Sequence, residues 1–187
     1  MYIETGYILP TKGSFRKNYD RVLFVGSVKS VPLTIGLGAE FPLLDDVRGY
    51  CEFWRASHEL SSSDQFTLSV IPGILGCRYY VPRDMIDLGE GNHVFVNLGF
   101  GVYWARFSAT YYLVSAAGTT YGIADDVKNY FGYGALGGCG VDLALAGPTS
   151  LALFINYDIT SLGSIRKGGL GNLGGFFAGI RLVFSLS

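Results

Sequence analysis

The residues of this chain best suited to catalysis gather in one short stretch, "ASHELSSSD", at residues 56–64. His58 stands there among Ser57, Ser61, Ser62 and Ser63, with Glu59 and Asp64 nearby. Acyl transfer needs a nucleophile and a base, and these side chains supply both. A catalytic triad is assembled in space, however, and serine-rich stretches are ordinary solvated loops. We therefore predict no catalytic residues, and keep as an alternative an enzyme that uses His58.

A second set of polar residues consists of single charged or amide side chains placed among glycine and apolar residues. In the last stretch, "GFFAGIRLVFSLS", Phe176, Ile180 and Phe184 share one alternating face, while Arg181 lies on the other with glycines. The members of this set are Glu4, Glu40, Glu52, Arg78, Asn97, Asp142, Asn156, Asp158 and Arg181. Both signs of charge are present, so the set can line a polar pore that selects solutes by charge, or pair into a plug.

The elements that position these residues are predicted to be strands, because a period of two runs through nearly the whole chain. The eight expected strands are residues 2–9, 33–43, 47–58, 66–81, 93–108, 130–145, 150–161 and 173–186. The odd-numbered connections are mostly long and lie at residues 10–32, 59–65, 109–129 and 162–172. The other three lie at 44–47, 82–92 and 146–149, and of these the first and the last are tight. Eight strands predict a closed up-and-down sheet with both termini at the short-turn end.

Composition favours a membrane barrel over a soluble protein. Apolar residues make up 49% of the 187 residues and charged residues only 16%, against about 25% charged in soluble domains. No run approaches the roughly 18 apolar residues of a membrane helix. Each expected strand has an apolar face suited to lipid and a face of glycine with isolated charges suited to a narrow interior. We predict one domain spanning residues 1–187, and the net charge of −1 gives no reason to expect nucleic acid as a partner.

Five stretches carry a resemblance to a known family: "GYILPTKGSFRKNY", "FVNLGFGVYWARF", "FGYGALGGCGVDLAL", "LALFINYDI" and "NLGGFFAGIRLVFSLS". Together they resemble the small eight-stranded outer-membrane barrels of Gram-negative bacteria, of the OmpA, OmpX and OmpW type. The resemblance implies an outer-membrane location, with any signal peptide already removed. Family members commonly end in phenylalanine, whereas this chain places Phe184 three residues before its end.

The function we expect is that of a non-enzymatic barrel without cofactor or metal, either a structural and surface-interaction protein or a narrow passive channel for small solutes. The lipid-modifying enzyme and a soluble lipocalin-like carrier are the alternatives. An eight-stranded interior is only just wide enough for its own side chains, which favours a plug over a pore. We expect a monomer in contact with outer-membrane lipid and lipopolysaccharide. The basic residues of the first long connection are candidates for lipopolysaccharide phosphates: Lys12, Arg16, Lys17 and Arg21.

Three local features complete the sequence-based expectations. The alternation slips near Pro72, so we predict a bulge at Pro72 and Gly73 that curves the wall. The cysteines, Cys51, Cys77 and Cys139, are expected to be mostly buried thiols, with a Cys51–Cys77 bridge as the alternative. Aromatic residues near both strand ends are expected to form two interface belts, with Trp54, Trp104, Phe107, Tyr130, Tyr133, Tyr157 and Phe176 at the long-loop end and Tyr2, Phe41, Tyr50, Tyr79, Tyr80 and Phe184 at the short-turn end.

Overall fold

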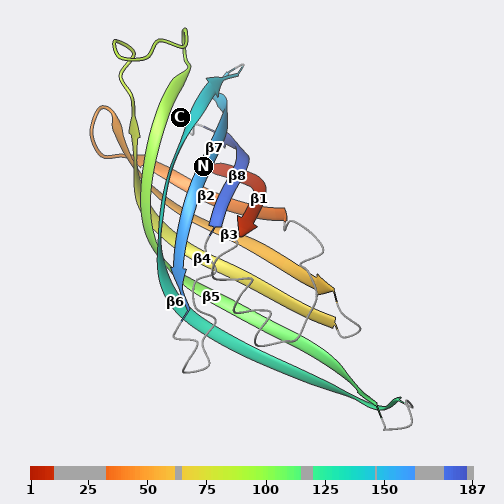
Figure 1. The fold of residues 1–187 in the computed structure, drawn as a ribbon. Coiled ribbons are helices and arrows are strands. Elements are labelled where there is room, and N and C mark those ends of the chain that lie inside the picture. The colour runs from red at the N-terminus through yellow and green to blue at the C-terminus, as the bar shows by residue number, and fades with distance from the viewer. Residues whose placement is uncertain (11–32, 62–64, 115–119, 146, 163–174, 185–187) are drawn as a thin grey trace.

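The chain forms the predicted closed barrel of eight antiparallel strands (Figure 1). A computed structural model describes residues 1–10, 33–61, 65–114, 120–145, 147–162 and 175–184. The strands are β1 (Tyr2–Pro10), β2 (Leu33–Pro42), β3 (Val47–Ser61), β4 (Gln65–Tyr80), β5 (His93–Val114), β6 (Thr120–Ala144), β7 (Thr149–Ser161) and β8 (Gly175–Phe184). No helix among the described residues is long and apolar enough to cross a membrane.

The barrel closes where β1 pairs with β8, from Tyr2 opposite Val183 to Pro10 opposite Gly175. The amino group of Met1 donates a hydrogen bond to the carbonyl oxygen of Phe184 at 3.0 Å. The two chain ends therefore meet at the short-turn end of the barrel, as an even number of strands requires. The tight connection after β2 lies at the same end.

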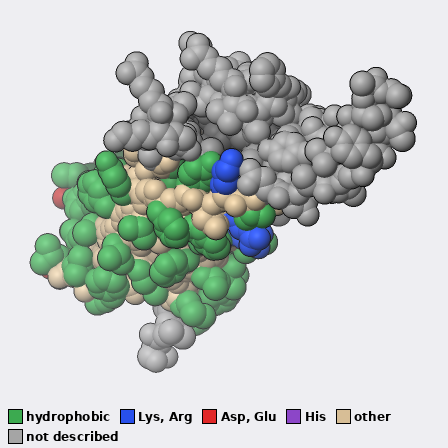
Figure 2. Space-filling view, turned by 90° about the horizontal axis from the view of Figure 1, so that it is seen from below, with side chains coloured by type: hydrophobic (Ala, Val, Ile, Leu, Met, Phe, Trp, Pro, Cys, Tyr) green, Lys and Arg blue, Asp and Glu red, His purple; other side chains and the backbone are tan. Residues whose placement is uncertain are grey.

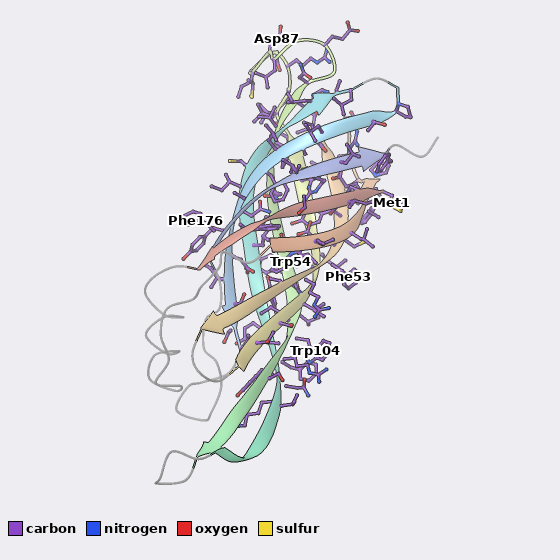
Figure 3. The ribbon with its side chains drawn as sticks, turned by 90° about the vertical axis from the view of Figure 1, so that its right-hand side faces the viewer. Met1, Phe53, Trp54, Asp87, Trp104 and Phe176 are labelled. Atoms are coloured by element: carbon purple, nitrogen blue, oxygen red, sulfur yellow. The ribbon has the colours of Figure 1, made fainter. Side chains whose placement is uncertain are left out.

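Alternation along each strand separates an apolar outer face from a filled interior, as the sequence predicted. On β5, Val102 is 71% exposed and Phe100 is 63% exposed on the outer face. Phe95 and Tyr103, on the opposite face of the same strand, are buried. Figure 3 shows Phe53 and Trp104 projecting outward from the wall. A soluble carrier would place its apolar face inward and its polar face in water. The lipocalin-like alternative is therefore wrong, because the charges lie inside and the apolar side chains outside.

The prediction of a long loop at 109–129 is wrong, because β5 and β6 continue as a paired hairpin from Ala109 opposite Asp126 to Val114 opposite Thr120. Within the described residues, β6 pairs with β7 only from Tyr133 onward. The first half of β6 therefore extends past β7, and beyond Thr110, where β5 stops pairing with β4, the ends of β5 and β6 pair only with each other among the described residues (Figure 1). The Ser, Thr, Gly and Tyr residues that favoured a loop are compatible with a strand here, because the two segments pair with each other as an antiparallel ladder.

The predicted bulge at Pro72 and Gly73 is also wrong. The register between β4 and β5 stays constant from Gln65 to Tyr80, and Pro72 lies opposite Tyr103 within it. Pairing with β3 is interrupted opposite Pro72, between Gly73 and Val70, and resumes in the same register. A proline nitrogen carries no hydrogen, so the wall loses ladder bonds there without inserting a residue. The apparent slip came from placing Val70 outside, whereas it is buried.

Two smaller expectations need correction. Cys77 and Cys139 are exposed on the outer face and Cys51 is half-buried, and all three thiols are free. A thiol is a small apolar group that suits a lipid-facing wall, so burial inside the barrel is unnecessary. Trp54, Tyr2 and Tyr50 are buried in the interior and do not belong to interface belts. Sequence proximity to a strand end cannot reveal which face an aromatic ring occupies.

Candidate functional site

The interior of the barrel gathers nearly all of the polar residues that the sequence singled out. Seven of them are buried, and the side chain of Glu40 is 5% exposed. The seven are Glu52, Arg78, Asn97, Asp142, Asn156, Asp158 and Arg181. Glu4 lies opposite Arg181 in the register of β1 and β8, and its side chain is outside the described part of the chain.

One buried ion pair crosses the barrel from β8 to β3. Arg181 Nη2 lies 3.3 Å from Glu52 Oε2, and both side chains are almost fully buried. The hydroxyl of Tyr2 donates a hydrogen bond to the same carboxylate oxygen at 3.0 Å. The guanidinium carbon of Arg181 also lies 4.3 Å from the centre of the Tyr2 ring and 4.9 Å from that of Phe154. A buried charge is tolerated only when it is paired, and this one has both a carboxylate and ring faces around it.

A second ion pair joins β4 to β2 nearer the short turns. Arg78, whose side chain is fully buried, pairs with Glu40. Its guanidinium carbon lies 4.6 Å from the centre of the Phe95 ring and 5.4 Å from that of Tyr50. The two buried arginines are thus held by carboxylates from other strands, and each pair ties together strands that are not adjacent in the wall.

The second pair continues into a hydrogen-bonded cluster at the short-turn mouth. The hydroxyl of Tyr80 donates to Asp142 Oδ2 at 2.9 Å and lies 3.2 Å from Glu40 Oε2. Arg48 reaches from the rim to 4.0 Å from Glu40, with half of its side chain exposed. A mouth cavity of about 430 Å³ opens here, and Tyr80, His93 and Asp142 are among the residues that line it.

Deeper in the barrel, Asp158 accepts hydrogen bonds from the hydroxyls of Tyr103 at 2.8 Å and Thr160 at 3.1 Å. Asn97 and Asn156 face each other across Gly138, since each lies opposite that glycine in the register. Asn97 on β5 and Asn156 and Asp158 on β7 therefore extend the polar interior from the mouth toward the long-loop end.

Aromatic rings fill the space between the polar groups. The ring centres of Trp54 and Phe177 lie 5.4 Å apart, and those of Phe154 and Phe177 lie 5.1 Å apart. The ring of Tyr2 occupies the space where a side chain at Gly38 would project. Pairing a large ring with a glycine on the facing strand lets a narrow barrel close around its own side chains. The sequence analysis did not predict that the rings of Tyr2, Tyr50 and Trp54 lie in the interior. Tyr50 and Trp54 could have been predicted, because they alternate in step with Glu52, which was expected to face inward on the same strand.

Other candidate residues fall outside what the structure describes. Lys12, Arg16, Lys17 and Arg21 lie outside the described residues. His58 belongs to β3, opposite Leu68, but its side chain lies outside the described part. Within the described residues, no cluster of three or more histidine, cysteine, aspartate or glutamate side chains could hold a metal ion.

A closed barrel with an apolar outer wall and a charged, internally paired core defines the class of this molecule. It is an integral β-barrel protein of the bacterial outer-membrane type. No protein-family model matches the chain, and no curated protein sequence matches it significantly.

Solved structures do share the fold. Ail, the attachment invasion locus protein of Yersinia pestis, is similar at a TM-score of 0.50 with 11% sequence identity, over 97% of this chain and 92% of Ail. Neisserial surface protein A is similar at a TM-score of 0.48 with 17% identity, over 98% of this chain and 96% of that protein. At such identities the likeness is one of fold, and the predicted small eight-stranded outer-membrane barrel is confirmed.

Proposed function

We propose that this protein is a non-enzymatic, internally plugged outer-membrane barrel that acts as a structural and surface-interaction protein. The observation that carries the proposal is the interior itself, where Arg78 and Arg181 are fully buried and paired with Glu40 and Glu52. These pairs cross the lumen and are flanked by ring faces. A plug of this kind stabilises the wall and leaves function to the ends of the barrel.

The β5–β6 hairpin supports a role at the surface. β5 has 22 residues and β6 has 25, whereas β1, β2 and β8 have 9 or 10. The extra length projects away from the short turns, opposite the end marked by Asp87 in Figure 3. In outer-membrane barrels the long connections face the outside of the cell. Ail is named for attachment and invasion; a comparable contact role for the projecting hairpin of this chain is our proposal.

A narrow passive channel for small solutes is the second candidate. The mouth cavity at the short-turn end favours it, because Tyr80 and Asp142 of the polar interior line this cavity. A continuous path would also have to pass the level of Glu52 and Arg181, where both side chains are buried against rings. The channel therefore requires that the crossing pair open.

Ion conductance in a planar bilayer separates the two candidates. We expect the refolded wild-type protein to be silent and a Glu52→Ala/Arg181→Ala variant to conduct or to lose stability. Discrete wild-type current steps would refute the plug and favour the channel. Folding of each sample is checked by its heat-dependent mobility in gels, so that silence is not confused with unfolded protein.

The enzyme alternative is tested separately, because it depends on one residue. If the barrel modified lipid through His58, a His58→Ala variant would lose hydrolysis or transfer of lipid acyl chains. We expect neither the wild type nor the variant to change the acyl content of lipopolysaccharide vesicles. Acyl release by the wild type that the variant lacks would overturn the non-enzymatic assignment.

A further inference from the structure

The outer wall carries two arginines at about the same height along the barrel axis. They take no part in the ion pairs of the interior. Arg55 on β3 and Arg106 on β5 are both exposed. The parity of their strands turns them outward, since Trp54 and Ala105 beside them are buried. Among the described residues neither arginine forms an ion pair. Within the part of the chain that the structure describes, two cations with no anionic partner therefore stand on the outside of a membrane barrel.

These arginines mark the border of the apolar band. The outward side chains of β5 are apolar from Val94 to Trp104, and the next outward residue is Arg106. Ten residues of strand span roughly 34 Å, or about 24 Å along the membrane normal at a tilt of about 45°. This length matches the apolar band of about 25 Å found on outer-membrane barrels. Arg106 therefore lies where hydrocarbon gives way to lipid headgroups, at the long-loop end.

On the neighbouring strands the apolar band also ends at the height of Arg106. Arg55 lies in the interrupted part of the β3–β4 ladder, where the register on either side aligns it with Ile71, and Ile71 lies opposite Trp104 of β5. Arg106 lies opposite Asn129 of β6, and Asn129 Oδ1 accepts a hydrogen bond from the indole nitrogen of Trp104 at 3.3 Å. An indole held at this height is typical of the membrane interface. Figure 2 shows basic side chains gathered at one border of the apolar surface.

The spacing of the two arginines suits one headgroup. They are separated by two strand spacings and offset by two residues, which places their backbones about 12 Å apart. Each side chain can reach about half of that distance, so both guanidinium groups can close on one phosphate or on two phosphates of the same lipid. Arginine forms forked hydrogen bonds to phosphate, which gives geometry as well as charge.

We propose that Arg55 and Arg106, with Trp104 between them, form a binding site for the phosphorylated headgroup of an outer-leaflet lipid. The lipid's acyl chains lie along the exposed apolar residues directly below, among them Phe53, Phe100 and Val102. A soluble anion would use the charges and leave this adjoining apolar surface unused. The site is distinct from the surface-interaction role and rests only on the membrane-spanning class of the protein.

The test compares two lipids that differ only in phosphate. The protein is reconstituted in phosphatidylcholine nanodiscs that contain a minor fraction of either bisphosphorylated or dephosphorylated lipid A, and the lipid retained after mild detergent extraction is counted by native mass spectrometry. We expect the wild type to retain roughly thirty times more of the phosphorylated lipid, as two interfacial arginines would provide. An Arg55→Gln/Arg106→Gln variant should retain the two lipids about equally.

The matched control is Arg83→Gln, which removes one exposed charge from the short-turn end and should keep the wild-type preference. If the double variant fails to fold, the two single variants replace it, and each should reduce the preference about fivefold. Equal retention of the two lipids by the wild type, or a preference that survives in the folded variants, overturns the site. Displacement of the lipid by millimolar inorganic phosphate would assign the arginines to a soluble anion and overturn the lipid assignment.

Discussion

The buried pair of Glu52 and Arg181 allows a quantitative prediction. Replacing Glu52 by glutamine keeps the shape of the side chain and removes its charge, so the fully buried Arg181 loses the carboxylate that lies 3.3 Å from its Nη2. Removing one partner of a buried pair costs about 3–5 kcal/mol. The ring faces of Tyr2 and Phe154 remain and offset part of this cost. We therefore expect Glu52→Gln to lower the free energy of unfolding by about 3 kcal/mol.

The same reasoning makes the double variant less harmful than the single one. With Arg181→Met added, neither charge of this pair remains and no large void is left, and such replacements of a buried pair are often close to neutral. We expect the double variant to lie within about 1 kcal/mol of the wild type, so it should be about 2–3 kcal/mol less destabilised than Glu52→Gln alone.

Urea-induced unfolding from lipid vesicles measures these changes, with tryptophan fluorescence as the signal. Trp54 is buried against Phe177 and reports on the interior. Arg48→Gln is the control, because this arginine is half exposed and 4.0 Å from its carboxylate, and it should change stability by less than about 0.5 kcal/mol. A cost below about 1 kcal/mol for Glu52→Gln, or costs that simply add in the double variant, would refute the reasoning about the plug.

Three further predictions concern the wall. Gly138→Ala should destabilise the barrel by about 1–3 kcal/mol in the same assay, because its new methyl group would overlap the backbone and an asparagine of the facing strand. Gly137→Ala is the matched control, since the nearest atoms to its methyl group lie 3.8 Å away, and equal effects of the two would contradict the packing argument. Replacing residues 111–123 with a tight turn should leave the heat-dependent gel mobility of the barrel unchanged, because within the described chain this hairpin end pairs only with itself; loss of folding would show that it supports the wall. Cys77 and Cys139 should react in vesicles with a lipid-soluble maleimide and resist a charged one, and rapid labelling by the charged reagent would mean that water reaches this face.

The sequence predicted the structure correctly where a strand crosses the membrane, because there one face meets lipid and the other meets the lumen. The β7 pattern was correctly predicted from Leu153 outside to Asp158 inside, because lipid and lumen impose opposite chemistry on successive residues. The end of the β5–β6 hairpin was not, because its Ser, Thr, Gly and Tyr residues are also those of a long loop. The bulge at Pro72 was wrong because one inward valine in a crowded lumen looks the same in sequence as a lipid-facing valine.

The sequence by itself determined the eight strands, the apolar outer face and the set of charges that turn inward. These follow from a local rule, a period of two with different solvents on the two sides of each strand. Only the tertiary structure decided which charges meet, because Arg181 reaches Glu52 across the lumen and Arg78 reaches Glu40. Those pairings depend on barrel closure and on the stagger between strands, which accumulate over the whole wall and leave no local signal. The same closure decided that Tyr2, Tyr50 and Trp54 fill the lumen, since the space for a ring exists only where facing strands leave it.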